Sequence, residues 1–316
     1  MNGAALAGVI EVRGLHKRFG ANLAVCDLNF TVQAGEIFGL VGPDGSGKTT
    51  TLRMLASVMR PDAGSIAIDG VDVLAQPEQA KQHVSYMPQR FGLYEDLTVQ
   101  ENIRFYADLF EVPKITWENR AYQLLAAADM SPFGHRLAGQ LSGGMKQKLG
   151  LICSLVHAPR VLLLDEPTTG VDPLSRREFW QILYSLRAEG VAMVISTAYL
   201  DEAERCDRLT LLHEGAMMYC DTPAGLKAGM PGAMLALIAA ESRRALAALP
   251  SLPGVQGVLM VGEAIHVHVD GPARLPQIRA ALAAAGIEVS TMDLVEPSIE
   301  DLFVALLEQR AQKVAA

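Results

Sequence analysis

Several residue patterns are missing from the chain, and each missing pattern removes a class of protein. Basic residues do not outnumber acidic ones: 27 lysines and arginines stand against 35 aspartates and glutamates, which gives a net charge of −8. Nucleic-acid-binding domains usually carry a basic face, so this balance argues against one. No stretch approaches the roughly 18 uninterrupted apolar residues that a membrane-spanning helix needs. The chain therefore does not read as a nucleic-acid binder or as an integral membrane protein.

Paired cysteines and a leader segment are also missing. The four cysteines are scattered and form no C-x-x-C pair, which suits a reducing cytosol rather than a disulfide framework. The apolar segment 4–10 has no basic region before it, and Glu11 and Arg13 interrupt it, so we do not read it as a signal peptide. Half of the 316 residues are apolar, and this length predicts two domains with real cores.

The stretch 37–50 is the most informative one that is present. An apolar segment of strand type is followed by G-P-D-G-S-G-K-T, which fits the phosphate-binding pattern G-x-x-x-x-G-K-[ST]. The glycines let successive backbone N–H groups come close to the phosphates. We expect Lys48 to reach the β/γ-phosphates and the Thr49 hydroxyl to ligate Mg²⁺. The predicted ATP-binding residues here are Gly42, Pro43, Asp44, Gly45, Ser46, Gly47, Lys48, Thr49 and Thr50.

A second stretch, 161–166, supplies acidic side chains. It is an apolar run without polar alternation, typical of a strand buried on both faces of a parallel sheet, and it ends in Asp165 and Glu166. Two carboxylates at such a place are costly unless they hold a cation. We expect Asp165 to hold Mg²⁺, directly or through water. We expect Glu166 to orient or deprotonate the water that attacks the γ-phosphate, which makes the chain a predicted ATPase.

A third stretch, Leu141–Gln147, reads L-S-G-G-M-K-Q and places a serine hydroxyl and two glycine amides at a predicted helix N-terminus. This is a second anion site, and one chain rarely needs two of them for one phosphate group. Two single residues complete the pattern. Gln89 follows a predicted strand, and Asp172 lies in the turn G-V-D-P shortly after Glu166.

Taken in this order, these stretches resemble the ATP-binding subunit of ATP-binding cassette (ABC) transporters over residues 9–222. The resemblance implies an α/β P-loop NTPase fold with a mixed-sheet core, a β-rich subdomain and a helical subdomain. The helical subdomain, matched by residues 91–140, would carry the docking surface for an integral membrane subunit. The resemblance also implies a homo- or heterodimer in which each ATP lies between the phosphate loop of one domain and the signature of the other. The signature residues for the partner's ATP would be Ser142, Gly143, Gly144 and Gln147.

The resemblance also implies roles for single residues. Phe19 matches the aromatic residue that stacks on adenine, and the less favoured alternative for this residue alone is an ordinary core aromatic. Gln89 matches the glutamine that contacts Mg²⁺ and senses the membrane subunit, although alone it would read as a loop residue. Asp172 matches the aspartate that communicates across the dimer. The expected cofactors are ATP and Mg²⁺, with Thr49, Gln89 and Asp165 as the metal-binding residues.

One position departs from the family pattern. The family has a histidine that touches the γ-phosphate, and the matching residue here is Ala198, which has no donor. One charge-assisted hydrogen bond contributes about 1.5–3 kcal/mol, so its loss from the transition state alone would slow the reaction about ten- to a hundredfold. Thr197 and Tyr199 are weaker candidates to replace it. We therefore hypothesise that the chain binds ATP well and hydrolyses it slowly at its own phosphate loop.

The composition changes after about residue 222. The tail is predicted to contain an alanine-rich helix over 233–249, strands over 255–261 and 264–269, a helix over 276–285, a strand over 287–294 and a capped helix over 299–312. We expect an ABC-type cassette over 9–222, a helical connection over 223–240 and a small α+β domain over 241–316.

Two details of the tail carry further expectations. Its ending, E-P-S-I-E-D-L-F, is similar to the extra C-terminal domain of the exporter branch linked to drug and antibiotic efflux, and Ser298 with Asp301 forms a capping box. His266 and His268 share one strand face. We predict two surface histidines rather than a metal site, because no third ligand is evident.

The predicted function is an ATP-hydrolysing subunit of an ABC exporter. It would be cytoplasmic, peripheral on the inner face of the cell membrane, and would power transport through a separate membrane subunit without binding nucleic acid. The alternative is a catalytically degenerate ATP-binding regulatory module in an asymmetric cassette pair. A soluble cassette protein acting on DNA or ribosomes is disfavoured, because neither a second cassette nor a long coiled-coil insertion is present.

Overall fold

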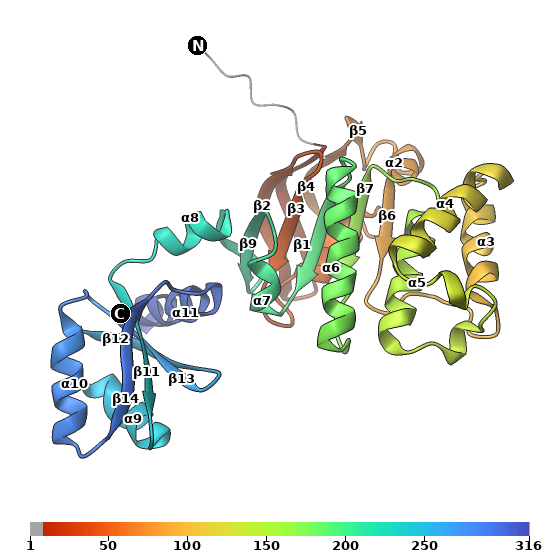
Figure 1. The fold of residues 1–316 in the computed structure, drawn as a ribbon. Coiled ribbons are helices and arrows are strands. Elements are labelled where there is room, and N and C mark those ends of the chain that lie inside the picture. Colours follow the sequence, from red (N-terminus) through yellow and green to blue (C-terminus); the bar gives the residue numbers. More distant parts are fainter. Residues whose placement is uncertain (1–8, 316) are drawn as a thin grey trace, which may run out of the picture. The chain divides into compact units, whose positions relative to one another are not determined.

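The computed structural model describes residues 9–315, with side chains described up to residue 307. The chain folds into two compact units, which Figure 1 shows in sequence colours. The first unit runs to Tyr199 and resumes over Cys206–Cys220, and the second comprises Leu200–Arg205 and the chain from Asp221 onward. In the part of the chain that the structure describes, no helix is both long and apolar enough to cross a membrane.

One ten-stranded mixed sheet organises the first unit, with the strand order β5-β4-β1-β2-β10-β9-β3-β8-β7-β6. Its strands are β1 (Ile10–Phe19), β2 (Asn22–Val32), β3 (Ile37–Val41), β4 (Ala63–Ile68), β5 (Val71–Asp72), β6 (Val84–Met87), β7 (Val161–Asp165), β8 (Ala192–Thr197), β9 (Arg208–His213) and β10 (Ala216–Asp221). Strands β1, β2, β4 and β5 pair antiparallel, whereas β6, β7, β8, β3 and β9 run parallel. The β-rich part and the parallel part are therefore continuous.

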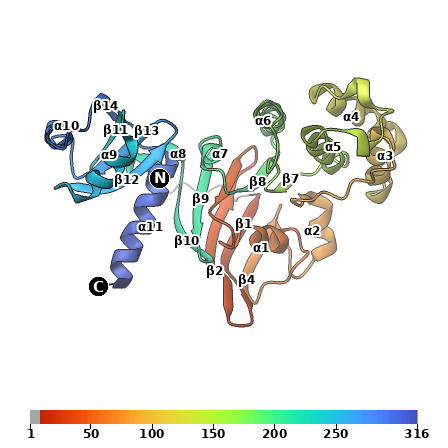
Figure 2. The same ribbon diagram turned by 90° about the horizontal axis from the view of Figure 1, so that it is seen from below.

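Helices cover both faces of the parallel strands, and Figure 2 shows α1 and α2 on one side of β7 and β8 and α6 on the other. The helices of this unit are α1 (Lys48–Leu55), α2 (Pro77–His83), α3 (Val99–Leu109), α4 (Lys114–Ala127), α5 (Gly143–Leu155) and α6 (Pro173–Ala188). Alternate residues of one strand enter opposite cores: Leu162 packs with Trp180 of α6, and Leu163 packs with Leu52 of α1. Burial on both faces explains why β7 has no polar alternation.

The segment 91–140, matched to the helical subdomain, contains two α-helices, α3 and α4. Helix α3 starts at a capping box in which Thr98 accepts a hydrogen bond from the Glu101 N–H and the Glu101 side chain accepts from Thr98. Helix α4 starts after Pro113, because proline fixes its own φ and disfavours a helical residue before it. With α5, these helices form the all-helical part of the first unit.

The second unit contains a four-stranded antiparallel sheet in the order β12-β13-β11-β14. Its elements are α7 (Leu200–Ala203), α8 (Pro223–Ala228), β11 (Ala233–Ala239), α9 (Ser242–Ala248), β12 (Val255–Val261), β13 (Ala264–Val269), α10 (Arg274–Ala284), β14 (Val289–Val295) and α11 (Ile299–Ala315). The predicted hairpin of β12 and β13 and the predicted capping box are confirmed, since Asp301 N–H donates to Ser298 Oγ and Asp301 accepts from Ser298 N–H.

Two expectations for the tail are wrong. The helix expected over 233–249 and the second half of the helical connection expected over 223–240 contain strand β11, which pairs with β13 and β14. Alanine favours a helix locally, but Leu235 and Leu237 alternate into the core of this unit, and sheet pairing on both edges outweighs that preference. The small domain expected from residue 241 would therefore lack its central strand.

The two histidines of β13 were predicted to be surface residues, and this prediction is wrong. Helix α11 packs against β12 and β13 and covers the sheet face that bears them. His266 Nδ1 lies 2.9 Å from Asp301 Oδ2, and His268 Nε2 lies 2.7 Å from the Pro231 carbonyl oxygen. Both side chains are satisfied within the unit.

Candidate functional site

The strand order brings the phosphate loop and the acidic pair together. The loop follows β3, the acidic pair ends β7, and β8 lies between these two strands. Val41 is in register with Thr197, and Asp165 is in register with Ser196. Because parallel strands present their carboxyl ends at one edge of a sheet, the three segments meet there.

The phosphate loop has glycine where no side chain fits. A Cβ on Gly42 would lie 2.3 Å from the Leu212 carbonyl oxygen, and a Cβ on Gly47 would lie 2.4 Å from the Ala24 carbonyl oxygen. Gly47 also has φ +102°, which other residues rarely adopt. It is the N-cap of α1 and provides no side-chain cap, so the helix N-terminus is open to an anion. Ser46 Oγ is buried and has no hydrogen-bond partner in the described residues, as expected for a group that awaits a ligand.

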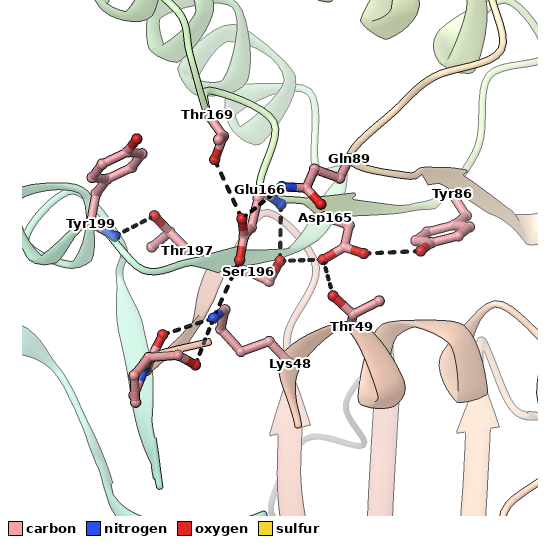
Figure 3. Close-up of polar contacts among 12 residues, drawn as sticks. Lys48, Thr49, Tyr86, Gln89, Asp165, Glu166, Thr169, Ser196, Thr197 and Tyr199 are labelled. Carbon is pink, nitrogen blue, oxygen red and sulfur yellow. Dashed lines mark hydrogen bonds and ion pairs between the residues drawn. The ribbon is translucent and has the colours of Figure 1, made fainter. Parts of the chain in front are cut away.

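Lys48 lies between the loop and the acidic pair (Figure 3). Its ammonium donates to the carbonyl oxygens of Gly42 at 2.8 Å and Pro43 at 3.0 Å, and it lies 3.3 Å from Glu166 Oε1. The residue is only 4% exposed. A buried ammonium at this point is placed to stabilise charge on a phosphate held by the loop.

Three hydroxyl groups orient the Asp165 carboxylate. Oδ1 accepts from Thr49 Oγ1 at 2.9 Å and from Ser196 Oγ at 2.7 Å, and Oδ2 accepts from the Tyr86 hydroxyl at 3.1 Å. Burial, followed by the Asp165 charge, raises the pKa of Tyr86 to about 12, so this phenol stays a donor at neutral pH. A carboxylate beside the Thr49 hydroxyl is the hard oxygen set that fits Mg²⁺.

The Glu166 carboxylate faces the cavity. Oε2 accepts from Gln89 Nε2 at 3.1 Å and from Thr169 Oγ1 at 3.4 Å, while Oε1 faces Lys48. The backbone of Glu166 has φ +48°, a left-handed conformation that directs the chain into Pro167. Lys48 and Glu166 therefore form a pair of opposite charges in which the acid can act as a base.

These groups line a cavity of about 530 Å³, within the usual range for ligand pockets. Its lining residues are Phe19, Asn22, Ala24, Asp44, Gly45, Gly47, Lys48, Thr49, Thr50, Gln89, Glu166 and Thr169. Phe19 is 47% exposed, so its ring is accessible to a planar ligand. The predicted signature residues and Asp172 are not part of this lining.

The signature residues and Asp172 are instead neighbours of one another. Ser142 is the N-cap of α5 and accepts from the Met145 N–H at 3.3 Å. A Cβ on Gly144 would lie 2.4 Å from Ser175 Oγ of α6, so only glycine allows this close approach. Asp172 is the N-cap of α6, and its hydrogen bonds with Ser175 hold its pKa below the ordinary value. Gln147, also predicted for this site, lies half-buried on α5.

The side chains on either side of Ala198 contact other groups of the first unit. Thr197 Oγ1 accepts from the Tyr199 N–H at 3.0 Å, and the Tyr199 ring packs 4.5 Å from the guanidinium carbon of Arg176. Figure 3 shows Tyr199 pointing away from Lys48 and Glu166. Neither neighbour of Ala198 therefore stands where the family's histidine would.

Sequence reasoning missed Tyr86, Thr169 and Ser196, and the cavity-lining residues Asn22 and Ala24. Tyr86 and Ser196 end strands on either side of β7, so the rule that parallel strands converge at their carboxyl ends would have selected them. That rule needs the strand order, which the local sequence pattern does not contain.

Comparisons with known proteins identify a family for this chain. Residues 25–169 match the model of the family described as "ABC transporter". The chain is 43% identical over 303 residues to the "Probable multidrug ABC transporter ATP-binding protein YbhF" of Escherichia coli (strain K12), covering 95% of this chain and 52% of that protein. The chain thus spans about half the length of this relative.

Two further matches cover nearly the whole length of the matched protein. The "Nod factor export ATP-binding protein I" of Rhizobium sp. (strain N33) is 35% identical over 306 residues, covering 96% of this chain and 98% of that protein. A solved "Structure of ATP binding subunit of ABC transporter" aligns with a TM-score of 0.64 and 30% identity, over 69% of this chain and 92% of that chain. These matches confirm the predicted family resemblance and fold class.

Proposed function

The chain belongs to the ATP-binding proteins of the ABC transporter family, and we propose that it is the ATP-hydrolysing subunit of an exporter with a separate membrane subunit. The observation that carries the proposal is that Lys48 and Glu166 line one cavity beside a glycine-rich loop, with Asp165 hydrogen-bonded to the lining residue Thr49. Binding alone would need the loop and Lys48, whereas an acidic residue beside the phosphates supplies a base for hydrolysis.

Each residue has a distinct part in the proposed reaction. Lys48 and the loop amides bind the phosphates, and Phe19 stacks on adenine. Thr49, Asp165 and Gln89 hold Mg²⁺, which when bound offsets charge on the β- and γ-phosphate oxygens. Glu166 orients the attacking water and takes its proton, and its hydrogen bond from Gln89 Nε2 links it to the residue proposed to sense the membrane subunit.

A second cassette is part of the proposal. Ser142, Gly143, Gly144 and Gln147 present an anion site that does not line the chain's own cavity. A partner domain facing head to tail would bring its phosphate loop to this signature, and Asp172 beside Gly144 would report closure between the two sites. The partner is a second copy or a related cassette.

Export is supported by the relatives, whose names specify multidrug transport and Nod factor export. The chain would lie in the cytoplasm against the inner face of the membrane. ATP binding would close the cassette pair, and hydrolysis with product release would reopen it. The alternative, a degenerate ATP-binding module in an asymmetric pair, is favoured by one observation only, the alanine at position 198.

Phosphate release by wild type and Glu166→Gln distinguishes the two functions. We expect the substitution to reduce turnover at saturating Mg-ATP at least about a hundredfold, because it removes the base while keeping the shape. Nucleotide binding should be retained. Glu118→Gln, on the exposed side of α4, is the matched control and should keep the wild-type rate. Equal rates for wild type and Glu166→Gln would favour the degenerate module.

A further inference from the structure

Ser196 is hydrogen-bonded to both acidic residues. Its hydroxyl donates to Asp165 Oδ1 at 2.7 Å and accepts from the Glu166 N–H at 3.0 Å. Its own carbonyl oxygen accepts from the same N–H at 3.1 Å. The residue is fully buried at the end of β8, in register with Asp165, and it does not line the cavity. Ser196 therefore touches the acids from behind rather than from the ligand side.

The backbone of Glu166 needs such support. A glutamate with φ +48° lies in a sparsely populated region, and the following Pro167 further restricts its backbone. A conformation of this kind persists only where the surroundings hold it in place. The two acceptors of Ser196 hold the Glu166 N–H, and this fixes the direction in which the Glu166 side chain leaves β7.

The Asp165 carboxylate needs a partner that does not leave when ligands bind. Oδ1 has two hydroxyl donors, Thr49 and Ser196. Thr49 lines the cavity and is a proposed metal-binding residue, so its hydroxyl is shared between ligand and aspartate. Ser196 does not line the cavity, so a ligand in the cavity does not compete directly for its hydroxyl.

We propose that Ser196 is a positioning residue that couples the metal-binding Asp165 to the proposed base Glu166. This inference rests on the proposed function of the two acids. One hydroxyl orients the aspartate carboxylate and the glutamate backbone together, so the metal-binding group and the base keep a fixed relation during turnover.

Tyr86 provides the internal contrast. It orients Asp165 from the other side, through Oδ2 at 3.1 Å, and has no hydrogen bond to Glu166 in the structure. Tyr86→Phe should therefore weaken metal binding and lower kcat less than the Ser196 variants do. Removing the Ser196 hydroxyl should affect both properties.

The test compares Ser196→Ala and Ser196→Cys with wild type, Glu166→Gln and Tyr86→Phe in the full chain. Cysteine is slightly larger than serine and fills the site, but its thiol bonds weakly, so it separates loss of the hydrogen bond from loss of packing and serves if the alanine variant does not fold. Ser154→Ala is the matched control, since Ser154 is also buried and donates to a backbone carbonyl at 2.8 Å. The readouts are kcat, the KM for ATP, and Mn²⁺ affinity measured by electron paramagnetic resonance with ADP present.

We expect both Ser196 variants to lose about ten- to a hundredfold in kcat with the KM for ATP within about twofold, and Mn²⁺ to bind about three- to tenfold more weakly. Wild-type kcat and Mn²⁺ affinity in Ser196→Cys would overturn the proposal, provided that Glu166→Gln is inactive. If Glu166→Gln turns over like wild type, the proposed base is wrong instead.

Discussion

The two units each contain a cluster of buried charged groups, and the clusters differ in what surrounds them. In the first unit, Lys48, Asp165 and Glu166 line or adjoin a cavity of about 530 Å³. In the second, His266 and Asp301 adjoin a space of only about 10 Å³, too small for more than one water molecule. Burial of charge is common to both clusters, so burial alone does not identify a functional site.

The partners of the charged groups explain the difference. Asp301 accepts from the Ser298 N–H and hydroxyl and from His266, so its hydrogen bonds stay within the unit and cap the start of α11. Lys48 and Glu166 bond weakly to each other at 3.3 Å and face open space that a ligand can enter. We propose that the first cluster serves chemistry and the second serves stability, and substitutions can test that division.

The largest effect on stability is expected from Asp301→Ala. It leaves His266 and the start of α11 without their partner, at a cost of about 2–4 kcal/mol. Both tryptophans, Trp117 and Trp180, lie in the first unit, so fluorescence reports that unit while far-UV circular dichroism reports both. In urea, the dichroism transition should move to lower concentration while the fluorescence midpoint stays.

ATP turnover of Asp301→Ala should remain within about twofold of wild type, because the cluster is not part of the cavity. Asp293→Ala, at an exposed position of β14, is the control and should change neither transition. A loss of turnover as large as that of Glu166→Gln would contradict the division between the two clusters.

A smaller effect is expected for His157, a buried histidine of the first unit outside the cavity. Burial lowers the pKa of His157 to about 4, from an ordinary value of about 6.5. Between these pH values the unfolded chain binds a proton that the folded chain does not, so stability falls as the pH falls. At pH 5 the loss amounts to about 2 kcal/mol.

Phenylalanine at this position keeps the stacking on Phe110, whose ring lies 3.8 Å away, and binds no proton. His157→Phe should therefore shrink the difference in unfolding free energy between pH 7 and pH 5 by about 2 kcal/mol, measured by tryptophan fluorescence in urea. An unchanged difference would show that His157 does not titrate in this range. Turnover at pH 7 should match wild type.

The smallest expected effect is a gain, from Ala198→His. A donor toward the γ-phosphate should raise turnover of the isolated protein about three- to tenfold at saturating Mg-ATP. Ala188→His, at an exposed position of α6, is the control and should leave turnover unchanged. An unchanged rate in Ala198→His would mean that the alanine is not what limits hydrolysis.

Local patterns predicted much of the fold and part of the site. The loop from Gly42 to Thr49 and the buried strand β7 follow from motif and periodicity, and the hairpin of β12 and β13 follows from alternation around Gly262. Strand β11 was not predicted, because alanine-rich segments are locally compatible with a helix. The surface assignment of His266 failed because a helix from the end of the chain covers it.

The amino-acid sequence was sufficient to propose the phosphate-binding residues. The local backbone leaves no room for a side chain at Gly42 and Gly47, and Lys48 follows them directly. Which residues contact Asp165 and Glu166 was decided only by the tertiary structure. Strand β8 enters the sheet between β3 and β7, and this brings Ser196 against Asp165 and Glu166, which lie 31 and 30 positions earlier in the sequence. Such neighbours arise from long-range strand pairing and core packing, which no local motif encodes.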